Sequence, residues 1–377
     1  MIRIIRLPII MLLILTISIF CVGAVFSGTS CPPRESIYPC TCFNVPQGKK
    51  LLHIIVSCQG LSNTDSFSTI VPSLKTMEID EFYLYDSFWE AHRLGAEGER
   101  KQVLPLDWIT FLRIKEMKIV DTTLSSCFAC QSTLTCRNSK MTKFIAVNSS
   151  NTEKICSLCD TGRGDKYSWT NCLSKLSHFE FTGGKLSTLG SELFPLAMRE
   201  LLLLNLSNNK IYKVDPKVFR NLPKLKYLDL SHNIIERLDN LFNTPMASLE
   251  FLDVSWNNIM TIGPNLFPLL PALKKFNAGY NTIVDLKEKD WKEVPWLLRE
   301  IDLRGISVPY TGMKFRFFTM GECNFDQSAE MSMRRSKLRV PNWIRVDPLS
   351  WGSAAEYSWT INRYNKDSVD YKKKEAV

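Results

Sequence analysis

Apolar residues recur with a fixed period between residues 201 and 286. Four consecutive segments are 24 residues apart, and each carries apolar residues at relative positions one, four, six and eleven, with asparagine at position nine. The four segments begin at Leu201, Leu225, Leu249 and Leu273. A period of this length predicts a solenoid, in which each coil buries its apolar edge against the next coil.

The spacing also predicts the shape of each coil. Positions one, four and six alternate along a short strand and point into one core, while the residues between them face outward. The asparagines follow the strand, where a buried turn needs a side chain that both donates and accepts hydrogen bonds. A second apolar set closes the far side of each coil: Val218, Phe219, Leu241, Phe242, Leu266 and Phe267. The pattern is that of the leucine-rich repeat, an α/β solenoid with a curved parallel sheet and an irregular convex side.

The repeat is regular over residues 176–305 and degenerate over residues 61–175, where longer intervals predict insertions. Gly184 takes the place of the asparagine in the coil that opens the regular block. Three strands are predicted in the degenerate region, from Leu74, Met77 and Ile79, from Ile114, Met117, Ile119 and Leu124, and from Met141 and Phe144.

Outward positions of the regular repeats gather aromatic residues. Position three contributes Tyr227 and Phe251, and position eight contributes His232, Trp256 and Tyr280. We expect them to cluster on the concave face as a protein-binding surface, because exposed aromatic side chains on a rigid face are typical of binding hot spots. The alternative is that they pack on one another or under the C-terminal segment. Position five is an acidic column, which is mostly background for this repeat type.

The N-terminus predicts export. Arg3 and Arg6 precede an apolar stretch over residues 7–26, and small residues up to Ala24 suit cleavage, so residues 1–24 are expected to be a signal peptide. The same stretch is long enough for an uncleaved membrane anchor, which stays open as the alternative. We expect no membrane span after cleavage and a secreted, extracellular protein.

A group of cysteines lies at the start of the predicted solenoid, within residues 31–60: Cys31, Cys40, Cys42 and Cys58. The segments CPPRESIYPCTC and IIVSCQGLS resemble the cysteine-rich N-terminal cap of extracellular leucine-rich repeat proteins. The resemblance implies disulfides between Cys31 and Cys42 and between Cys40 and Cys58. The cap and degenerate early repeats together are similar to arthropod secreted members of the family, among them the non-catalytic subunit of shrimp luciferase.

The insertions carry six further cysteines: Cys127, Cys130, Cys136, Cys156, Cys159 and Cys172. Two CxxC pairs could hold zinc, but in an exported chain we expect disulfides of unassigned connectivity. Between Cys159 and Cys172 lies the tripeptide Arg163-Gly164-Asp165, which integrins recognise in many matrix proteins. It is a candidate adhesion loop, with an ordinary solvated loop as the alternative.

Two sequons predict glycosylation, at Asn148 and at Asn205, which falls on the exposed strand face. At the other end, residues 306–360 lack the several cysteines of the family's usual C-terminal cap, with only Cys323 present, and predict an atypical end. Residues 361–377 are expected to be a disordered tail. A basic cluster at Arg334, Arg335, Lys337 and Arg339 could contact anionic glycans or be an ordinary solvated surface.

Composition separates the function classes. A formal charge of +9 over 377 residues, scattered along an exported chain, argues against nucleic acid as a partner. The four histidines lack metal-ligand spacing, and no catalytic motif is present, so we expect no enzyme activity, cofactor or metal. The preferred prediction is a recognition or scaffold protein that binds an extracellular or cell-surface protein. The alternatives are an integrin-binding adhesion ligand and a non-catalytic subunit of a secreted enzyme complex.

Overall fold

The computed structural model describes most of the chain between residues 30 and 305 and three short strands beyond it. The described residues are 30–47, 51–62, 64–87, 103–105, 108–124, 140–149, 153–155, 159–160, 166–167, 173–191, 193–194, 198–284, 294–305, 314–317, 329–332 and 344–345.

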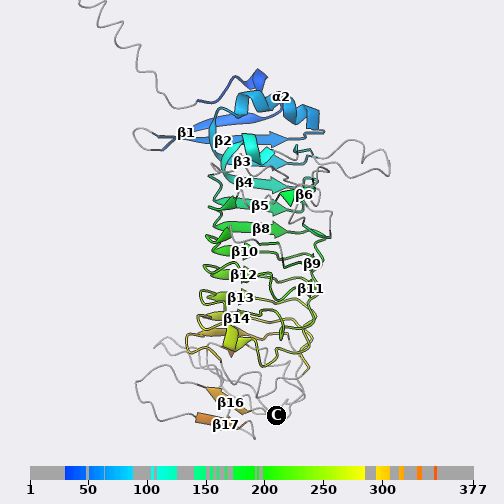
Figure 1. Ribbon diagram of the computed structural model, residues 1–377, viewed down its shortest axis with the longest axis vertical. Coiled ribbons are helices and arrows are strands. Elements are labelled where there is room, and N and C mark those ends of the chain that lie inside the picture. Colours follow the sequence, from blue (N-terminus) through cyan, green and yellow to red (C-terminus); the bar gives the residue numbers. More distant parts are fainter. Residues whose placement is uncertain are drawn as a thin grey trace, which may run out of the picture.

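Within these residues one sheet runs the length of the molecule (Figure 1). Its twelve strands follow chain order, with β1 (Thr41–Gln47) antiparallel to β2 (Leu51–Gln59) and all later neighbours parallel. The later strands are β3 (Glu78–Tyr85), β4 (Arg113–Val120), β5 (Lys143–Val147), β8 (His178–Thr182), β10 (Leu203–Asn205), β12 (Tyr227–Asp229), β13 (Phe251–Asp253), β14 (Lys275–Asn277), β15 (Glu300–Asp302) and β18 (Ile344–Arg345).

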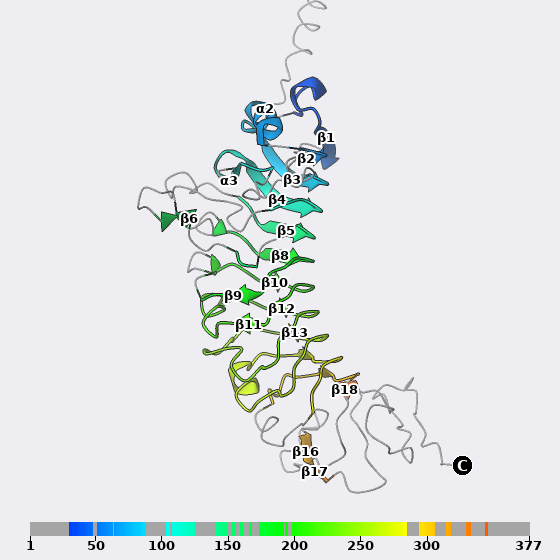
Figure 2. The same cartoon turned by 90° about the vertical axis from the view of Figure 1, so that its right-hand side faces the viewer.

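Shorter elements complete the coils. The helical segments are η1 (Arg34–Ser36), α2 (Thr64–Leu74), α3 (Trp108–Phe111) and η6 (Phe267–Leu269). The paired short strands are β6 (Cys159–Asp160) with β7 (Lys166–Tyr167), β9 (Thr188–Leu189) with β11 (Lys213–Val214), and β16 (Lys314–Phe317) with β17 (Ala329–Ser332). In side view, α2, α3, β6, β9 and β11 lie on the side away from the main sheet (Figure 2).

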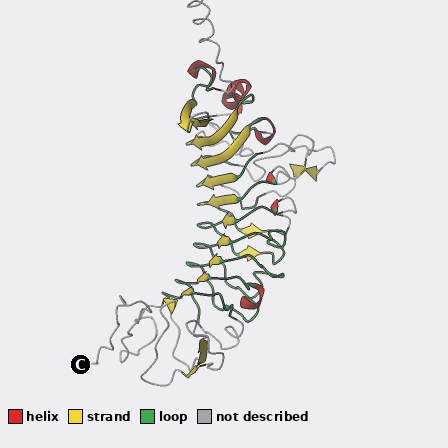
Figure 3. Cartoon of the chain, turned by 90° about the vertical axis from the view of Figure 1, so that its left-hand side faces the viewer, coloured by secondary structure: helices red, strands yellow, loops and turns green. Residues whose placement is uncertain are grey.

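The register of the sheet confirms the predicted coil. Leu204, Leu228 and Leu252 stand beside one another on adjacent strands and are fully buried. Each fully buried leucine contributes about 1.5–3 kcal/mol from apolar burial, and most of that contact is with the coils above and below. The predicted second apolar set, which includes Phe219, Phe242 and Phe267, is buried on the far side. The fold is a leucine-rich repeat solenoid with a curved parallel sheet and an irregular convex side (Figure 3).

The asparagines at position nine form a buried ladder. The side-chain nitrogen of Asn257 donates to the carbonyl oxygens of Leu230, Val254 and Ser255 at 2.9–3.1 Å, and its Oδ1 accepts from the Ile235 amide at 2.9 Å. Each asparagine therefore satisfies backbone groups of its own coil and of the coil before it. The same pattern holds at Asn209, Asn233 and Asn281.

Earlier coils replace the asparagine with a hydroxyl side chain. Ser87, Thr122 and Ser149 are buried at the same position, and each hydroxyl donates to the carbonyl two residues earlier, at 2.7–3.0 Å. Each also accepts a backbone amide from the preceding coil; for example, the Ser149 hydroxyl accepts from the Thr122 amide at 3.2 Å. A hydroxyl satisfies fewer groups than an amide, which fits the less regular coils of this region.

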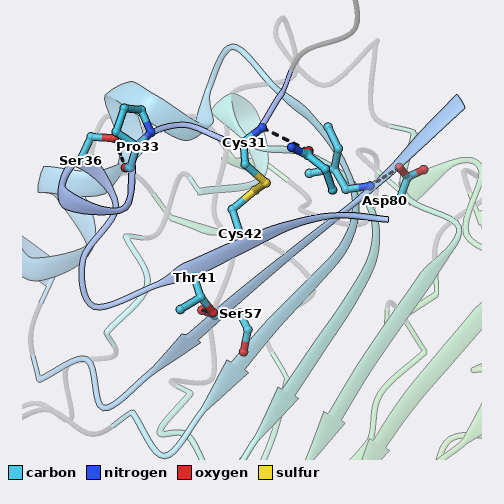
Figure 4. Close-up of a disulfide and its surroundings, with 9 residues drawn as sticks. Cys31, Pro33, Ser36, Thr41, Cys42, Ser57 and Asp80 are labelled. Atoms are coloured by element: carbon cyan, nitrogen blue, oxygen red, sulfur yellow. Dashed lines mark hydrogen bonds between the residues drawn. A yellow bond between two sulfur atoms is a disulfide. The ribbon is translucent and has the colours of Figure 1, made fainter. Parts of the chain in front are cut away.

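The cap covers the open end of the solenoid with a hairpin rather than a coil. β1 pairs along its whole length with β2, and the two disulfides are those that the family resemblance implies, Cys31–Cys42 and Cys40–Cys58. Figure 4 shows the first of these, with the Cys31 amide donating to the Asn44 side chain at 3.2 Å. Cys40 and Cys58 are buried, so this disulfide belongs to the core.

One predicted strand was wrong. The spacing of Leu74, Met77 and Ile79 fits the strand template, but Leu74 ends α2 and the strand begins at Glu78. The residues that align with Ile114, Met117 and Ile119 are Ile79, Phe82 and Leu84. Both triplets have the same spacing, and the structure selects the second because α2 uses Leu74 on its buried face. The strands predicted around Met117 and Phe144 are confirmed.

At the C-terminal end the sheet continues past the regular repeats. β18 pairs in parallel with β15, Ile301 beside Ile344, and so adds a strand to the last coil. Between them β16 and β17 form an antiparallel pair. The basic cluster at residues 334–339, Cys323 and residues 361–377 lie outside the described residues.

Candidate protein-binding surface

The outward residues of the main sheet form continuous columns. Position three is confirmed by register: Leu203 pairs with Tyr227, Tyr227 with Phe251, and Phe251 with Lys275. Tyr227 and Phe251 are half-buried and stack with ring centroids 4.4 Å apart. Such pairs contribute about 0.5–1.5 kcal/mol beyond burial, so this pair is a rigid apolar element of the concave face.

The position-eight residues form a second stack, just after the strands. His232 stacks on Trp256 at 5.3 Å, and Trp256 stacks on Tyr280 at 4.3 Å. All three are exposed, with Trp256 at 50% and Tyr280 at 39%. The five predicted aromatic residues therefore form two stacks, one on the sheet and one on the rim where the strands end. We call the second stack the rim ladder.

The rim ladder occupies an unusual backbone position. In ten successive coils the position-eight residue has φ between 44° and 71°, the left-handed region. The ten residues are Gly60, Asp86, Asp121, Asn148, Gly183, Asn208, His232, Trp256, Tyr280 and Gly305. The amides of eight of these residues donate to a carbonyl of the next coil; that of Trp256 donates to the Gly279 carbonyl at 3.0 Å.

Most residues in this column are those that tolerate a left-handed backbone. Glycine has no Cβ to clash, and aspartate and asparagine adopt the conformation more readily than other residues. Trp256 and Tyr280 depart from that rule in two consecutive coils, after His232, whose residue type adopts this conformation more readily. For bulky side chains the conformation costs about 1–2 kcal/mol each, and such strain is concentrated at functional sites.

One end of the rim ladder is closed by glycine. A Cβ on Gly305 would lie only 2.4–3.0 Å from three ring atoms of Tyr280, so the absence of a side chain makes room for the ring. The faces of Trp256 are also covered, by His232 and Tyr280. Trp256 therefore exposes the edge of its ring and not its faces.

The exposed apolar surface extends beyond the predicted residues. Positions ten and twelve, which follow the rim ladder along each coil, carry further exposed apolar side chains: Tyr212 (58% exposed), Ile234 (42%), Met260 (47%) and Val284 (58%). They were not predicted from the sequence, because only positions three, five and eight were considered as outward positions. The same 24-residue alignment contains the signal for these residues, because it shows apolar side chains at positions ten and twelve, which are not among the core positions.

The acidic column at position five has a structural role. The Oδ1 atoms of Asp229 and Asp253 each accept the backbone amide two residues later at 2.9 Å, and so fix the turn after the strand. Asn205 and Asn277 make the same bond at 3.0 and 3.1 Å. An amide therefore serves the turn as well as a carboxylate does.

Burial raises the pKa of the Asp253 carboxyl above its ordinary value, and the like charge of Asp229 adds to this shift, against hydrogen bonds from Ser255 and Asn277. Burial, followed by Asp229 and Asp253, also raises the pKa of the Tyr227 phenol to about 12, so the phenol stays protonated. Both shifts arise because acidic side chains are close together and half-buried at the centre of the concave face.

We expect Asp253→Asn to change the pH dependence of stability. Native Asp253 holds its proton more tightly than the unfolded chain does, so wild-type stability falls as pH rises from 3.8 through the raised pKa. The variant loses this term, so its stability rises relative to that of wild type between pH 3.8 and pH 7. This change adds to a pH-independent loss of one hydrogen bond, because an amide has one acceptor oxygen where Asp253 uses two. Urea denaturation at pH 3, 5 and 7 measures it; a difference that is the same at all three pH values would contradict the assignment.

The N-terminal half of the concave face has paired charges. His53 Nε2 lies 2.7 Å from Glu81 Oε1, the Tyr83 hydroxyl donates to the same carboxylate, and Lys143 pairs with Glu116 at 2.8 Å. Side chains of β3, β4 and β5 line a pocket here: Glu81, Tyr83, Glu116, Lys118 and Lys143. The described residues contain no cluster of three or more His, Cys, Asp or Glu placed to hold a metal ion.

Several predicted site residues are not tested by the structure. Arg163, Gly164 and Asp165 lie outside the described residues, as do Cys127, Cys130, Cys136, Cys156 and Cys172, and of Cys159 only the backbone is described. Asn148 is exposed and Asn205 is half-buried, so glycosylation of both stays a prediction. The predicted signal peptide also lies outside the described residues. Among the described residues, no helix is long and apolar enough to cross a membrane.

Comparisons with known proteins agree with this fold. The family description "Leucine rich repeat" matches residues 174–235 and 199–259. No curated protein matches the sequence. The chain therefore has the fold of a leucine-rich repeat solenoid, and the family model matches part of its regular repeats.

Solved structures similar to the chain have low identity. A chain of the octameric complex of Latrophilin 3, Unc5D and FLRT2 has 15% identity and a TM-score of 0.42, over 63% of this chain and 71% of that one. An internalin from Listeria monocytogenes has 15% and 0.41, over 66% of each chain. A chain of the Toll–Spatzle complex of Drosophila has 14% and 0.38, over 66% of this chain and 40% of that one.

Proposed function

We propose that this chain is a secreted, non-enzymatic recognition protein that binds an extracellular or cell-surface protein through its concave face and the rim ladder. The observation that carries the proposal is the rim ladder itself. Three consecutive coils hold an aromatic or imidazole ring where the backbone favours glycine, asparagine or aspartate. The fold alone would be served better by those smaller residues, which indicates that the rings serve binding.

The surrounding surface supports the same proposal. Trp256 and Tyr280 are exposed, as are Met260 and Val284 four residues later in each coil, and Tyr227 and Phe251 stack on the strands of the coils that hold His232 and Trp256. Aromatic anchors surrounded by apolar contacts are the usual composition of a protein interface. The cap disulfides support secretion, because disulfides persist in oxidising compartments.

Trp256→Asn tests the proposal with little effect on the fold. Asn148 and Asn208 already adopt the same backbone conformation in this column. Loss of ring stacking, about 0.5–1.5 kcal/mol per pair, is offset by relief of left-handed strain, so we expect stability within about 2 kcal/mol of wild type. Capture of cell-surface or secreted proteins, measured by cross-linking and pull-down, should nevertheless fall at least about tenfold.

Lys217→Asn, an exposed change on the far side of the coil, is the matched control and should leave capture unchanged. If the Trp256→Asn variant remains folded and captures the same proteins as wild type, the rim ladder is not the interface.

A second candidate function is adhesion through Arg163-Gly164-Asp165. One observation favours it: β6 and β7, on either side of residues 161–165, pair antiparallel on the side of the solenoid away from the sheet (Figure 2). The pairing brings the ends of the tripeptide segment together, as a presented loop requires. Attachment of integrin-bearing cells to coated protein should be abolished by Asp165→Glu. Attachment that survives this substitution would rule the adhesion function out.

A further inference from the structure

The charges of the concave face are compensated toward both ends of the sheet and uncompensated in the middle. On β3 to β5 the acids have cationic or hydrogen-bonding partners, such as Lys143 on Glu116. Further along, Lys275 pairs with Glu300 at 2.9 Å, and Arg304 pairs with Asp302 at 2.6 Å. In between, Glu180, Asp229 and Asp253 have no ion pair with any described residue.

These three carboxylates lie in one column. Glu180 is beside Asn205, Asn205 beside Asp229, and Asp229 beside Asp253 on adjacent strands. Adjacent strands are about 4.8 Å apart, so two neighbouring carboxylates repel each other at short range. The turn does not require that charge, because Asn205 and Asn277 make the same backbone bond. The negative charge is thus in excess of what the fold needs.

The stacked rings of Tyr227 and Phe251 lie two residues before Asp229 and Asp253 on the same strands. An apolar wall next to a carboxylate suits lysine and arginine, whose methylene stems pack on apolar surface while the charged head reaches an acid. A metal ion is a poorer fit, because both oxygens of Asp253 already accept hydrogen bonds, Oδ1 from Ser255 and Oδ2 from Asn277.

We propose that the partner bound on this surface is a protein segment rich in lysine or arginine, whose cationic heads pair with Glu180, Asp229 and Asp253 beside the Tyr227–Phe251 stack. This inference rests on the proposed function, since it names the charge of the partner bound next to the rim ladder. The chain itself carries a formal charge of +9, so the acidic column is a local exception on a basic protein. Complementary charge at such a site selects the partner and speeds association.

Two fluorescein-labelled peptides test the inference on the full chain: one with three Lys-Gly-Leu-Ser repeats and one with three Glu-Gly-Leu-Ser repeats. Fluorescence anisotropy at 50 mM and 300 mM NaCl should show that wild type binds the lysine peptide, that salt weakens this binding, and that the glutamate peptide binds at least about tenfold less tightly. Asp229→Asn with Asp253→Asn should weaken the lysine peptide about tenfold or more.

The column offers matched variants in both directions. Asn205→Asp adds a carboxylate between Glu180 and Asp229, keeps the bond to the Ser207 amide, and should tighten binding of the lysine peptide. Asp215→Asn removes an acid elsewhere, where an amide can still accept from the Lys217 amide, and should have no effect.

The inference is overturned if the lysine peptide does not bind, if the two peptides bind equally, or if the Asp→Asn pair leaves affinity unchanged. It is also overturned if calcium binds wild type, but not this pair, in calorimetry, because the column would then be a cation site. Failure of the proposed function is distinguishable from these outcomes. That function depends on Trp256 and is judged by pull-down, which can succeed with a partner of any charge.

Discussion

Asn257→Ala is expected to lower the free energy of unfolding by about 3–5 kcal/mol, the largest effect of any single substitution considered. The side chain makes four hydrogen bonds in a buried turn, three as donor and one as acceptor. Alanine would leave the buried Ile235 amide without an acceptor, which costs about 1–3 kcal/mol. It would also remove one hydrogen bond, worth about 0.5–1.5 kcal/mol, from each of three carbonyls that keep another donor: Leu230, Val254 and Ser255. Urea denaturation measures the total loss.

The damage should also be local. Hydrogen exchange should speed at the Ile235 amide, which lies in the coil before Asn257, before it speeds at the strands of distant coils. Asn258→Ala, an exposed neighbour, is the control and should change stability by less than about 0.5 kcal/mol. A stable Asn257→Ala variant with a protected Ile235 amide would show that the ladder does not hold the coils together.

Removal of the core disulfide of the cap is the second large effect. Cys40→Ala with Cys58→Ala opens a link between residues 18 apart and should cost about 3 kcal/mol, because the cross-link restricts the unfolded chain. It should also loosen β1, because β1 is the edge strand of the sheet and pairs, among the described strands, only with β2. Loss of β1 would expose apolar side chains of β2, such as the buried Val56.

Limited proteolysis measures this second effect. Cleavage in β1 should become faster in the double variant while cleavage in the regular repeats stays slow. Equal resistance of β1 with and without the disulfide would mean that the hairpin is held by strand pairing alone.

The sequence was sufficient to predict the parts of the structure that depend on periodic burial. Leu228 and Asn257 sit where a 24-residue period places them, because every coil must meet its neighbours in the same way. The cap disulfides followed from a family resemblance rather than from spacing. Leu74 was misassigned because helix α2 and the next strand share one apolar spacing, and only contact with β4 decides between them.

The aromatic columns were predicted from the repeat, but their arrangement in space was not. Tyr227 and Trp256 were expected in one cluster, and they belong to separate stacks because position eight follows the strand. The left-handed backbone at Trp256 could not be read from the residue, since tryptophan gives no signal for it. The clue was in the other coils, where glycine, asparagine and aspartate recur at the same position. The buried hydroxyls that replace the asparagine in the earlier coils, such as that of Thr122, were not predicted, because only asparagine was expected at position nine.

The most direct test of the binding account is photo-cross-linking from the rim ladder. Trp256 is replaced by p-benzoylphenylalanine, and Lys217 on the far side of the coil is replaced in the same way as a control. Irradiation in the presence of the captured protein should give a cross-linked product from position 256 and none from position 217. Cross-links from position 217 alone would contradict the account, because the partner would then contact the convex side and the strained rings would have no part in binding.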